Sequence, residues 1–321
     1  MALHVIVGAG PVGVGTARLL AAVGHRVRLV SRSGRGPAGG AAGGTAGGGR
    51  IEPVAMDATD AAALAEVAGG AAALYNCANP AYHRWPRDWP PLAAALLATA
   101  ERTGAVLVTM GNLYGYGPVG AAMTEDLPLA ATGSKGRVRA RMWADALAAH
   151  RAGRARVTEA RASDFYGPHA TANTVLGERF VPRVLAGRPV SVLGDPDAPH
   201  SWTYLPDVAA AIVVLGTDER ALGRAWHVPT APALSQRAMA RLFAEQAGAP
   251  EPRLRTVPAP VVWAAGLVSP LMRELRETAH QFARPFVLDS AAFTETFGVQ
   301  PTPVDTAVKE TVAWWQARSA A

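Results

Sequence analysis

Residues 3–32 read LHVIVGAGPVGVGTARLLAAVGHRVRLVSR and set the expected architecture. The apolar run at the start, LHVIV, contains β-branched residues and is typical of a buried strand. The turn GAGPVG follows at residues 8–13, and residues 14–23 carry apolar side chains at helical spacing. Gly24 ends this helix, and residues 26–30 have the character of a second strand. The order strand, glycine turn, helix, strand predicts a βαβ unit.

The G-x-G-x-x-G spacing between a strand and a helix predicts a dinucleotide-binding turn. Gly8 allows the tight turn, Gly10 lets the backbone approach a pyrophosphate, and Gly13 allows close packing of helix on strand. The free N–H groups of the helix N-terminus then face the anion. The predicted cofactor residues here are Gly8, Gly10, Pro11, Val12 and Gly13. The alternative is a glycine turn with no ligand.

The end of the second strand predicts which dinucleotide is bound. NAD sites place an Asp or Glu there for the ribose 2′-hydroxyl, whereas NADP sites use an Arg for the 2′-phosphate. The residues here are Ser31, Arg32 and Ser33, without a carboxylate. Because Arg can hold a phosphate through two charge-assisted hydrogen bonds, we expect NADP(H), with NAD less favoured. The alternative is a merely solvated arginine.

Composition narrows the possible functions. A length of 321 residues, half of them apolar, allows a two-lobed protein or two domains. The single cysteine, Cys77, excludes a disulfide framework and a multi-cysteine metal site, and we expect no metal. The absence of a membrane span or signal peptide predicts a cytoplasmic protein. The net charge of +6 comes from scattered arginines without a nucleic-acid motif, so we expect no nucleic-acid partner.

Strand and helix patterns alternate along the first half of the chain. Strands are expected at 51–56, 71–76, 105–109 and 156–161, and helices at 60–67, 91–103 and 135–149. This alternation predicts an α/β fold with a Rossmann-type doubly wound parallel sheet. After Asp164 the pattern loosens into short helices near 173–186, 206–215, 235–247 and 303–317 and strands near 190–193 and 225–228.

This looser half predicts a smaller C-terminal α+β substrate lobe. The expected domains are 1–165 for dinucleotide binding and 166–321 mainly for substrate, with some segments returning to the sheet. Residues 34–49 hold nine glycines in sixteen positions, too many for a helix. They predict a flexible loop, either a flap beside the 2′-phosphate site or a low-complexity insertion.

Two connections carry further candidate residues. Asp57 follows the third strand and is placed to accept from an adenine amino group; alternatively Asp57, Thr59 or Asp60 caps the next helix. The turn after the fourth strand lies where open α/β sheets bind ligands, and its candidates are Cys77, Ala78 and Asn79. The proline-broken loop beyond it contains Tyr82, His83, Trp85 and Trp89. These rings predict either one wall of a substrate pocket or a small hydrophobic cluster beneath the loop.

Four short motifs occur in a consistent order. L-Y-G at 113–115 is similar to V-Y-G, R-A-S-D-F-Y-G-P at 161–168 to R-x-x-N-V-Y-G-P, and Y-L-P-D-V-A at 204–209 to Y-V-x-D-V-A. The C-terminal pattern is completed by Phe297, Gly298, Pro301 and residues 311–314. Together they resemble the extended short-chain dehydrogenase/reductase family, the epimerase/dehydratase group of nucleotide-sugar enzymes. The resemblance covers nearly the whole chain and implies a small-molecule substrate and a possible homodimer.

The resemblance also implies a catalytic set, from which this chain departs. The family uses a Ser or Thr three residues before V-Y-G and a Tyr-x-x-x-Lys, in which the tyrosine is the acid/base and the lysine holds the nicotinamide ribose. Lys135 fits the lysine, but Ala131 stands at the tyrosine position. Met110 stands at the Ser/Thr position, with Thr109 adjacent. Isoflavone-reductase-like members also lack the tyrosine and work with the lysine alone.

Lys135 stands out on internal grounds too. It is one of two lysines, with Lys309, among 31 basic Lys and Arg residues. Arginine cannot replace it readily in proton exchange, because its pKa lies above about 12. The alternative is a random surface lysine.

Residues on the loops after the fifth and sixth strands are the candidates to complete the proton relay. With Lys135, the catalytic candidates are Thr109, Tyr114, Asp164 and Tyr166, and Ser163 is assigned to the cofactor site. A buried carboxyl can have its pKa raised enough to donate a proton, which favours Asp164 as an acid or substrate ligand. The tyrosines could equally be core residues. His169 and His200 are expected to be surface or hydrogen-bonded residues, not metal ligands.

These observations predict an NADPH-dependent reductase of a small-molecule carbonyl or imine. One alternative is a catalytically silent NADP-binding regulatory protein. Another is a nucleotide-sugar epimerase or dehydratase, for which Arg179, Arg183 and Arg188 offer only a generic basic pocket.

Overall fold

The computed structural model describes residues 1–36, 50–171, 174–258, 260, 261, 263, 267 and 277–319. The chain forms two compact units that are interleaved in sequence. Unit 1 comprises Met1–Gly115, Ser134–Arg161 and Val208–Trp226, and unit 2 comprises Tyr116–Gly133, Ala162–Asp207 and His227–Ala321. Most of the predicted glycine-rich loop, residues 37–49, lies outside the described residues.

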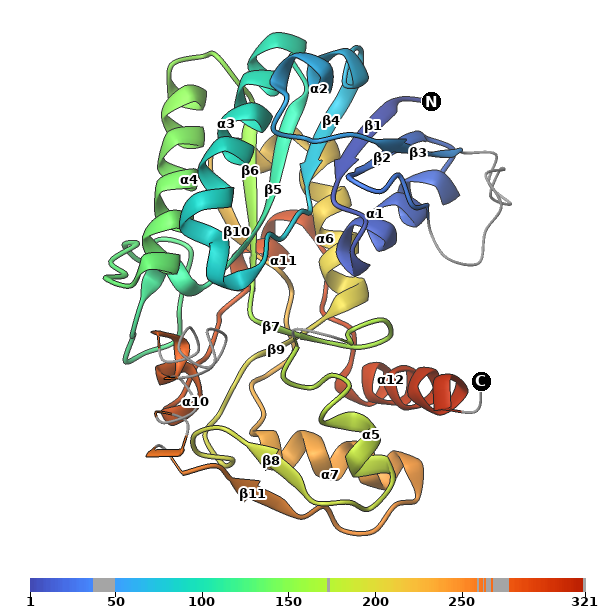
Figure 1. Ribbon diagram of the computed structural model, residues 1–321, viewed down its shortest axis with the longest axis vertical. Coiled ribbons are helices and arrows are strands. Elements are labelled where there is room, and N and C mark those ends of the chain that lie inside the picture. Colours follow the sequence, from blue (N-terminus) through green and yellow to red (C-terminus); the bar gives the residue numbers. More distant parts are fainter. Residues whose placement is uncertain are drawn as a thin grey trace. The chain divides into compact units, whose positions relative to one another are not determined.

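Unit 1 is built on a seven-stranded sheet with the order β10-β6-β5-β4-β1-β2-β3 (Figure 1). Its strands are β1 (Leu3–Val7), β2 (Arg26–Ser31), β3 (Ile51–Ala55), β4 (Ala71–Asn76), β5 (Val106–Asn112), β6 (Val157–Ala162) and β10 (Ala225–His227). β1 pairs in parallel with both β2 and β4, and the pairs β2–β3 and β4–β5 are also parallel. The strand order reverses between β1 and β4, and such a switch point is where open sheets bind ligands. The predicted Rossmann-type α/β fold is confirmed.

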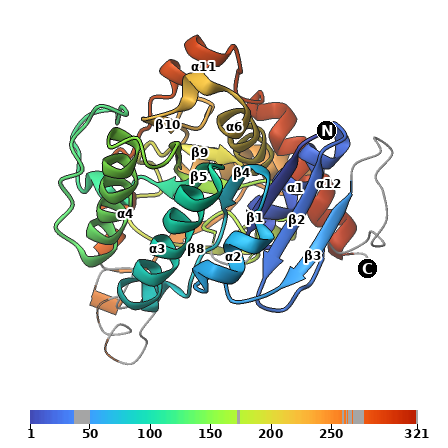
Figure 2. The same cartoon turned by 90° about the horizontal axis from the view of Figure 1, so that it is seen from above.

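Helices cover both faces of this sheet. α1 (Pro11–Ala22) and α6 (Leu205–Thr217) lie on one side, and α2 (Ala61–Val67), α3 (Trp85–Thr103) and α4 (Ser134–Arg151) lie on the other (Figure 2). Side chains such as Leu20, Leu29 and Leu74 are fully buried between the layers. Each such side chain contributes about 1.5–3 kcal/mol to folding, so the packed layers fix the strand ends that carry the site.

Helix α3 corrects one prediction. The helix expected at 91–103 begins six residues earlier, at Trp85, and contains Pro90 and Pro91. Trp85 and Trp89 are one helical turn apart, only 2% and 0% exposed, and both pack into the core of unit 1. Burial of these two indoles offsets the backbone hydrogen bonds that the prolines cannot make. The aromatic loop is therefore mostly helix.

Unit 2 contains two short parallel strand pairs and five described helices. The pairs are β7 (Asp164–Tyr166) with β9 (Trp202–Tyr204), and β8 (Val190–Val192) with β11 (Leu254–Thr256). The helices are α5 (Val181–Leu185), α7 (Gln236–Ala247), α10 (His280–Ala283), α11 (Ala291–Phe297) and α12 (Val304–Ser319). The helix expected near 173–186 is wrong in extent, because the described residues 174–186 form only α5, which has Pro182 in its first turn.

Candidate functional site

The glycine turn is held by three strands of unit 1. Gly8 has a φ of +111°, and a Cβ at this position would lie 2.5 Å from the carbonyl oxygen of Cys77. A Cβ at Gly13 would overlap the carbonyl of Gly8. The N–H of Gly8 donates to the carbonyl of Val30 (2.9 Å), and the N–H of Cys77 donates to the carbonyl of Val7 (2.8 Å). The predicted roles of Gly8 in the turn and Gly13 in close packing match this geometry.

The start of α1 is open to an anion. Gly10 is the N-cap residue, no side chain caps the helix, and Pro11 occupies its first turn. A Cβ at Gly10 would meet no atom within 4 Å. The first intrahelical bond there runs from the N–H of Val14 to the carbonyl of Gly10 (2.9 Å), which leaves the N–H groups of Val12 and Gly13 without an intrahelical partner. Free N–H groups beside empty space fit the pyrophosphate of a dinucleotide.

The end of β2 presents a guanidinium with no acidic residue on the strand itself. Ser31 is the last residue of β2, and Arg32 and Ser33 follow it as exposed residues. Asp57 is also exposed, and it accepts from the N–H (3.0 Å) and hydroxyl (2.9 Å) of Thr59. These hydrogen bonds, and more weakly the charge of Arg32, lower the pKa of Asp57. The α2 cap is Asp60, which accepts from two N–H groups of the first turn.

The carboxyl end of β4 lies beside the middle of β5. Asn76 at the end of β4 pairs with Thr109 of β5 in the parallel register. Cys77 follows, and burial raises the pKa of its thiol to about 12, so it remains protonated and is a poor nucleophile. Ala78 is half-buried and Asn79 is exposed. Thr109 is the residue of β5 that pairs with the end of β4, and it carries a hydroxyl group next to the turn at residues 77–79.

Lys135 is buried at the second residue of α4, with 1% of its surface exposed. Its Nζ lies 4.7 Å from the centre of the Tyr82 ring. The Tyr82 ring in turn makes an edge contact with Tyr114, which stacks on Trp85. The alternative of a random surface lysine is wrong. Ala131, at the position of the family's tyrosine, has no ring. The ring beside Lys135 is that of Tyr82, in the connection between β4 and α3.

Arg139 is a second buried cation, one turn after Lys135, that sequence reasoning missed. Its guanidinium carbon lies 4.6 Å from the Trp85 ring centre and 4.3 Å from that of Trp89. Its Nη1 donates to the carbonyl of Met110 (3.2 Å). Burial lowers the pKa of Arg139 to about 10, so it stays charged at neutral pH. The spacing of four residues from Lys135 places both on one helix face and was the available signal. Trp85 and Trp89 thus form a buried cluster rather than a substrate wall.

Three predicted residues lie in unit 2. Burial raises the pKa of Tyr166, which is 1% exposed, so its phenol is a poor proton donor. The N–H of Ser163 donates to the hydroxyl of Thr203 (3.2 Å). Asp164 is half-buried and hydrogen-bonds through Oδ2 to Nε2 of His200 (2.9 Å). His200 is hydrogen-bonded, as expected, but the sequence did not reveal that its partner is a candidate catalytic carboxyl.

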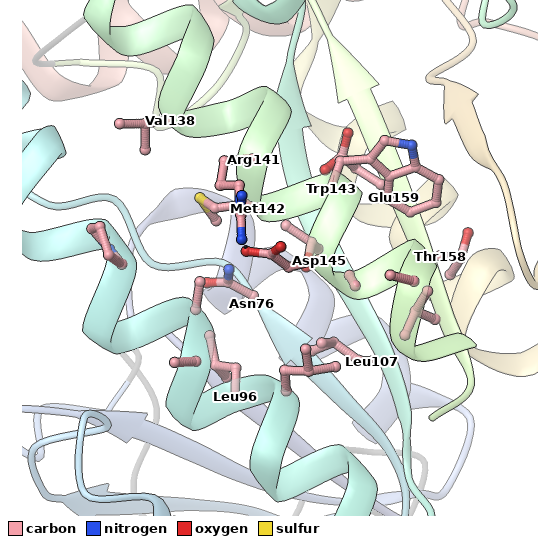
Figure 3. Close-up of a pocket in the computed structure, with 18 of the residues that line it drawn as sticks. Asn76, Leu96, Leu107, Val138, Arg141, Met142, Trp143, Asp145, Thr158 and Glu159 are labelled. Carbon is pink, nitrogen blue, oxygen red and sulfur yellow. Dashed lines mark hydrogen bonds and ion pairs between the residues drawn. The ribbon is translucent and has the colours of Figure 1, made fainter. Parts of the chain in front are cut away.

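A separate cavity of about 680 Å³ lies between α3, α4 and the sheet of unit 1 (Figure 3). Asn76, Leu107 and Glu159 line it from the strands, and Met142 and Asp145 line it from α4 (Figure 3). Among the described residues, its lining includes Thr109 but no other predicted site residue. This cavity is therefore not the predicted dinucleotide site.

The described residues offer neither a metal cluster nor a membrane-spanning helix. Within the described part of the chain, no group of three or more His, Cys, Asp or Glu side chains could hold a metal ion. No described helix is both long enough and apolar enough to cross a bilayer.

Comparison with known proteins decides the family. The sequence profile of the NAD dependent epimerase/dehydratase family matches residues 4–228. The chain belongs to this family. No curated protein sequence matches the chain significantly.

Solved structures of similar fold extend this likeness to the whole chain. The dTDP-glucose 4,6-dehydratase from Bacillus anthracis, in complex with NAD, has a TM-score of 0.78 at 16% identity, with 100% of this chain and 98% of that chain covered. The UDP-glucose 4-epimerase from Thermotoga maritima, with UDP-glucose, has a TM-score of 0.77 at 16% identity and 99% coverage of both chains. The UDP-N-acetylglucosamine 4-epimerase from Methanobrevibacter ruminantium has a TM-score of 0.80 at 12% identity, again with 99% coverage of both.

Each of these neighbours was solved with a ligand. The dehydratase holds NAD, the Thermotoga maritima epimerase holds UDP-glucose, and the Methanobrevibacter ruminantium epimerase holds UDP-N-acetylmuramic acid.

Proposed function

We propose that the protein binds a nicotinamide dinucleotide at the glycine turn and catalyses an oxidation–reduction at a sugar carbon of a nucleotide sugar. The observation that carries the cofactor part is the open cradle over Gly10, beside the closely packed Gly8 and Gly13. Family membership over residues 4–228 and the full-length likeness to nucleotide-sugar enzymes support the substrate class.

The chain's own residues have distinct tasks in this proposal. The N–H groups of Val12 and Gly13 bind the pyrophosphate, which α1 also attracts through its dipole. Lys135 binds the nicotinamide ribose, and its charge is stabilised by the Tyr82 ring 4.7 Å away. A dinucleotide held by these residues would supply reversible hydride transfer.

The dinucleotide bound at the glycine turn is either NAD or NADP. The NAD in the dehydratase neighbour and the family's name support NAD. The exposed Arg32 and the lack of a carboxylate on β2 support a 2′-phosphate. NAD is the better supported assignment, and comparison of the two affinities tests it.

A second candidate function is a dinucleotide-binding protein without turnover. Ala131 and Met110 favour it, because each replaces a hydroxyl-bearing residue on which the family relies. The carbonyl or imine reductase first expected from the sequence is a third candidate, because it needs no nucleotide subsite.

One assay separates these candidates. The protein is incubated with NAD and, in parallel, with NADP, together with dTDP-glucose, UDP-glucose or UDP-N-acetylglucosamine, and the sugars are analysed by mass spectrometry and NMR. Reduced dinucleotides are incubated with aldehydes, ketones and imines. We expect conversion of at least one nucleotide sugar. Oxidation of NADH or NADPH only by small carbonyls or imines would support the reductase, and binding without any turnover would support the silent protein.

A further inference from the structure

The cavity of about 680 Å³ between α3, α4 and the sheet is lined by residues of unit 1 (Figure 3). Its lining extends along α4 from Ser134 to Ala148. None of the described residues 8–13 of the glycine turn lines it. Pockets for small organic molecules have volumes of about 300–1,000 Å³, and protein interiors are otherwise close-packed. The cavity is therefore large enough for a ligand of its own.

Short apolar side chains create this space. Both helices line it with alanines, which are Ala93 and Ala94 in α3 and Ala146 and Ala148 in α4. These side chains are too short to fill the space above Leu107 of β5, which also lines the cavity. A buried water typically makes about three hydrogen bonds, which alanine and leucine side chains cannot supply. An apolar molecule, by contrast, would gain free energy by leaving water for such a space.

One polar group of the lining lacks a partner. Asn76, the last residue of β4, lines the cavity and is 1% exposed (Figure 3). Its Oδ1 is buried and accepts no hydrogen bond from the residues that the structure describes. Buried amide oxygens nearly always have a partner, because an unpaired one is unfavourable. A ligand with an N–H or O–H group would satisfy this oxygen.

The charged groups of the lining favour a neutral ligand. Glu159 is ion-paired with Arg161 at 2.6 Å, and both side chains are buried. Asp145 is ion-paired with Arg141 at 2.8 Å. These are the two carboxylates of the described lining, and its arginines, which are Arg137, Arg141 and Arg154, are exposed to solvent. A charged molecule would therefore lose its hydration in the cavity without meeting an unpaired, buried counter-charge.

We propose that this cavity binds a neutral, mostly apolar small molecule with a hydroxyl or N–H group, which donates a hydrogen bond to Oδ1 of Asn76. The apolar part of the ligand lies between the alanines of α3 and α4, and its polar group lies at the end of β4. This site is separate from the glycine turn, and it does not depend on the proposed function.

Indole is a suitable probe, because it is neutral and apolar and has a single N–H. 1-Methylindole has the same rings with a methyl group on the nitrogen, so it cannot donate to Asn76. The protein is labelled with ¹³C in its methionine methyl groups and titrated with each compound in an NMR experiment. Met142 lines the cavity, whereas Met239 is buried in α7 of unit 2 and is the internal control. The variant Met142→Leu identifies the Met142 signal.

We expect indole to shift the Met142 signal in a saturable way and to leave the Met239 signal unchanged. 1-Methylindole should bind about tenfold more weakly, because it leaves the oxygen of Asn76 unpaired. Ala146→Phe should fill the cavity and abolish the shift caused by indole. Ala144→Phe is the matched control and should keep that shift, because Ala144 is exposed on the same helix and does not line the cavity.

The comparison of the two probes needs no variant, so it tests the proposal even if Ala146→Phe does not fold. No shift of Met142 at millimolar indole would overturn the proposal, as would equal shifts of Met142 and Met239. Equal affinities for indole and 1-methylindole would overturn the hydrogen bond to Asn76. Light scattering gives the oligomeric state at each protein concentration. If indole bound only to a monomer formed on dilution, a second copy of the chain would be the occupant and the proposal would be wrong.

Discussion

Gly8→Ala should destabilise the fold of the glycine turn, whereas Gly10→Ala should leave the fold stable and weaken the binding of a dinucleotide. Gly8 has a φ of +111°, and a new Cβ would lie 2.5 Å from the carbonyl oxygen of Cys77 and 2.6 Å from the N of Ala78. The left-handed backbone alone costs an alanine about 1–2 kcal/mol, and a forced contact with backbone costs about 1–3 kcal/mol more. Gly8→Ala should therefore lose about 3 kcal/mol of unfolding free energy.

Gly10→Ala is the matched variant. Gly10 has a φ of −79°, which any residue adopts, and its Cβ would meet nothing within 4 Å. Its stability should match the wild type, but the methyl group would fill the space assigned to the pyrophosphate. Thermal unfolding should show Gly8→Ala lowered by about 6–12 °C and Gly10→Ala unchanged, since 1 kcal/mol corresponds to about 2–4 °C in a domain of this size.

Calorimetric titration then compares the affinity of Gly10→Ala for NAD with that of the wild type. Gly10→Ala should weaken binding at least about tenfold while the protein stays folded. If Gly10→Ala bound NAD as the wild type does, the pyrophosphate would not lie over Gly10. If Gly8→Ala melted as the wild type does, the packing argument for this turn would be wrong.

Three further variants test the remaining claims. Lys135→Met should lower kcat about 10²-fold or more with the fold intact, because it removes the buried ammonium. Lys309→Met, at an exposed position of α12, should leave kcat unchanged. If Lys135→Met were as active as the wild type, Lys135 would have no part in the mechanism. Arg32→Asp should lower the ratio of NADP affinity to NAD affinity, and an unchanged ratio in paired titrations would show that Arg32 does not read the 2′ position. Burial lowers the pKa of His4 from 6.5 to about 4. At pH values between these two, the unfolded chain binds a proton at His4 and the folded chain does not. Stability is full above pH 6.5 and should fall by about 3 kcal/mol as the pH drops to 4, at about 1.36 kcal/mol per pH unit. His4→Asn, which can still bond the Tyr75 hydroxyl (3.1 Å in the wild type), should lack this loss in unfolding curves, and parallel curves for the two proteins would contradict the assignment.

Local sequence patterns were sufficient to predict the first βαβ unit. In residues 3–32, strand, turn and helix each have their own pattern, and the glycines fix how they meet. The start of α3 was missed because its prolines argue against a helix, whereas burial of Trp85 and Trp89 depends on contacts that only the fold supplies.

The side-chain pairs of the candidate site could not be predicted for the same reason. Lys135 and Tyr82 are far apart in the chain and meet only because β4 and β5 are neighbours in the sheet. Asp164 and His200 are 36 positions apart and meet through the pairing of β7 with β9. Residue types alone identified Lys135 and Asp164 as candidates, but their partners are a property of the tertiary structure.

The central claim is that the turn at residues 8–13 binds a nicotinamide dinucleotide. Its most direct test is isothermal titration of the wild-type protein with NAD and NADP, each in oxidised and reduced form. We expect saturable one-to-one binding of at least one form, lost or weakened in Gly10→Ala. No heat of binding and no shift in melting temperature with any of the four at millimolar concentration would contradict the claim.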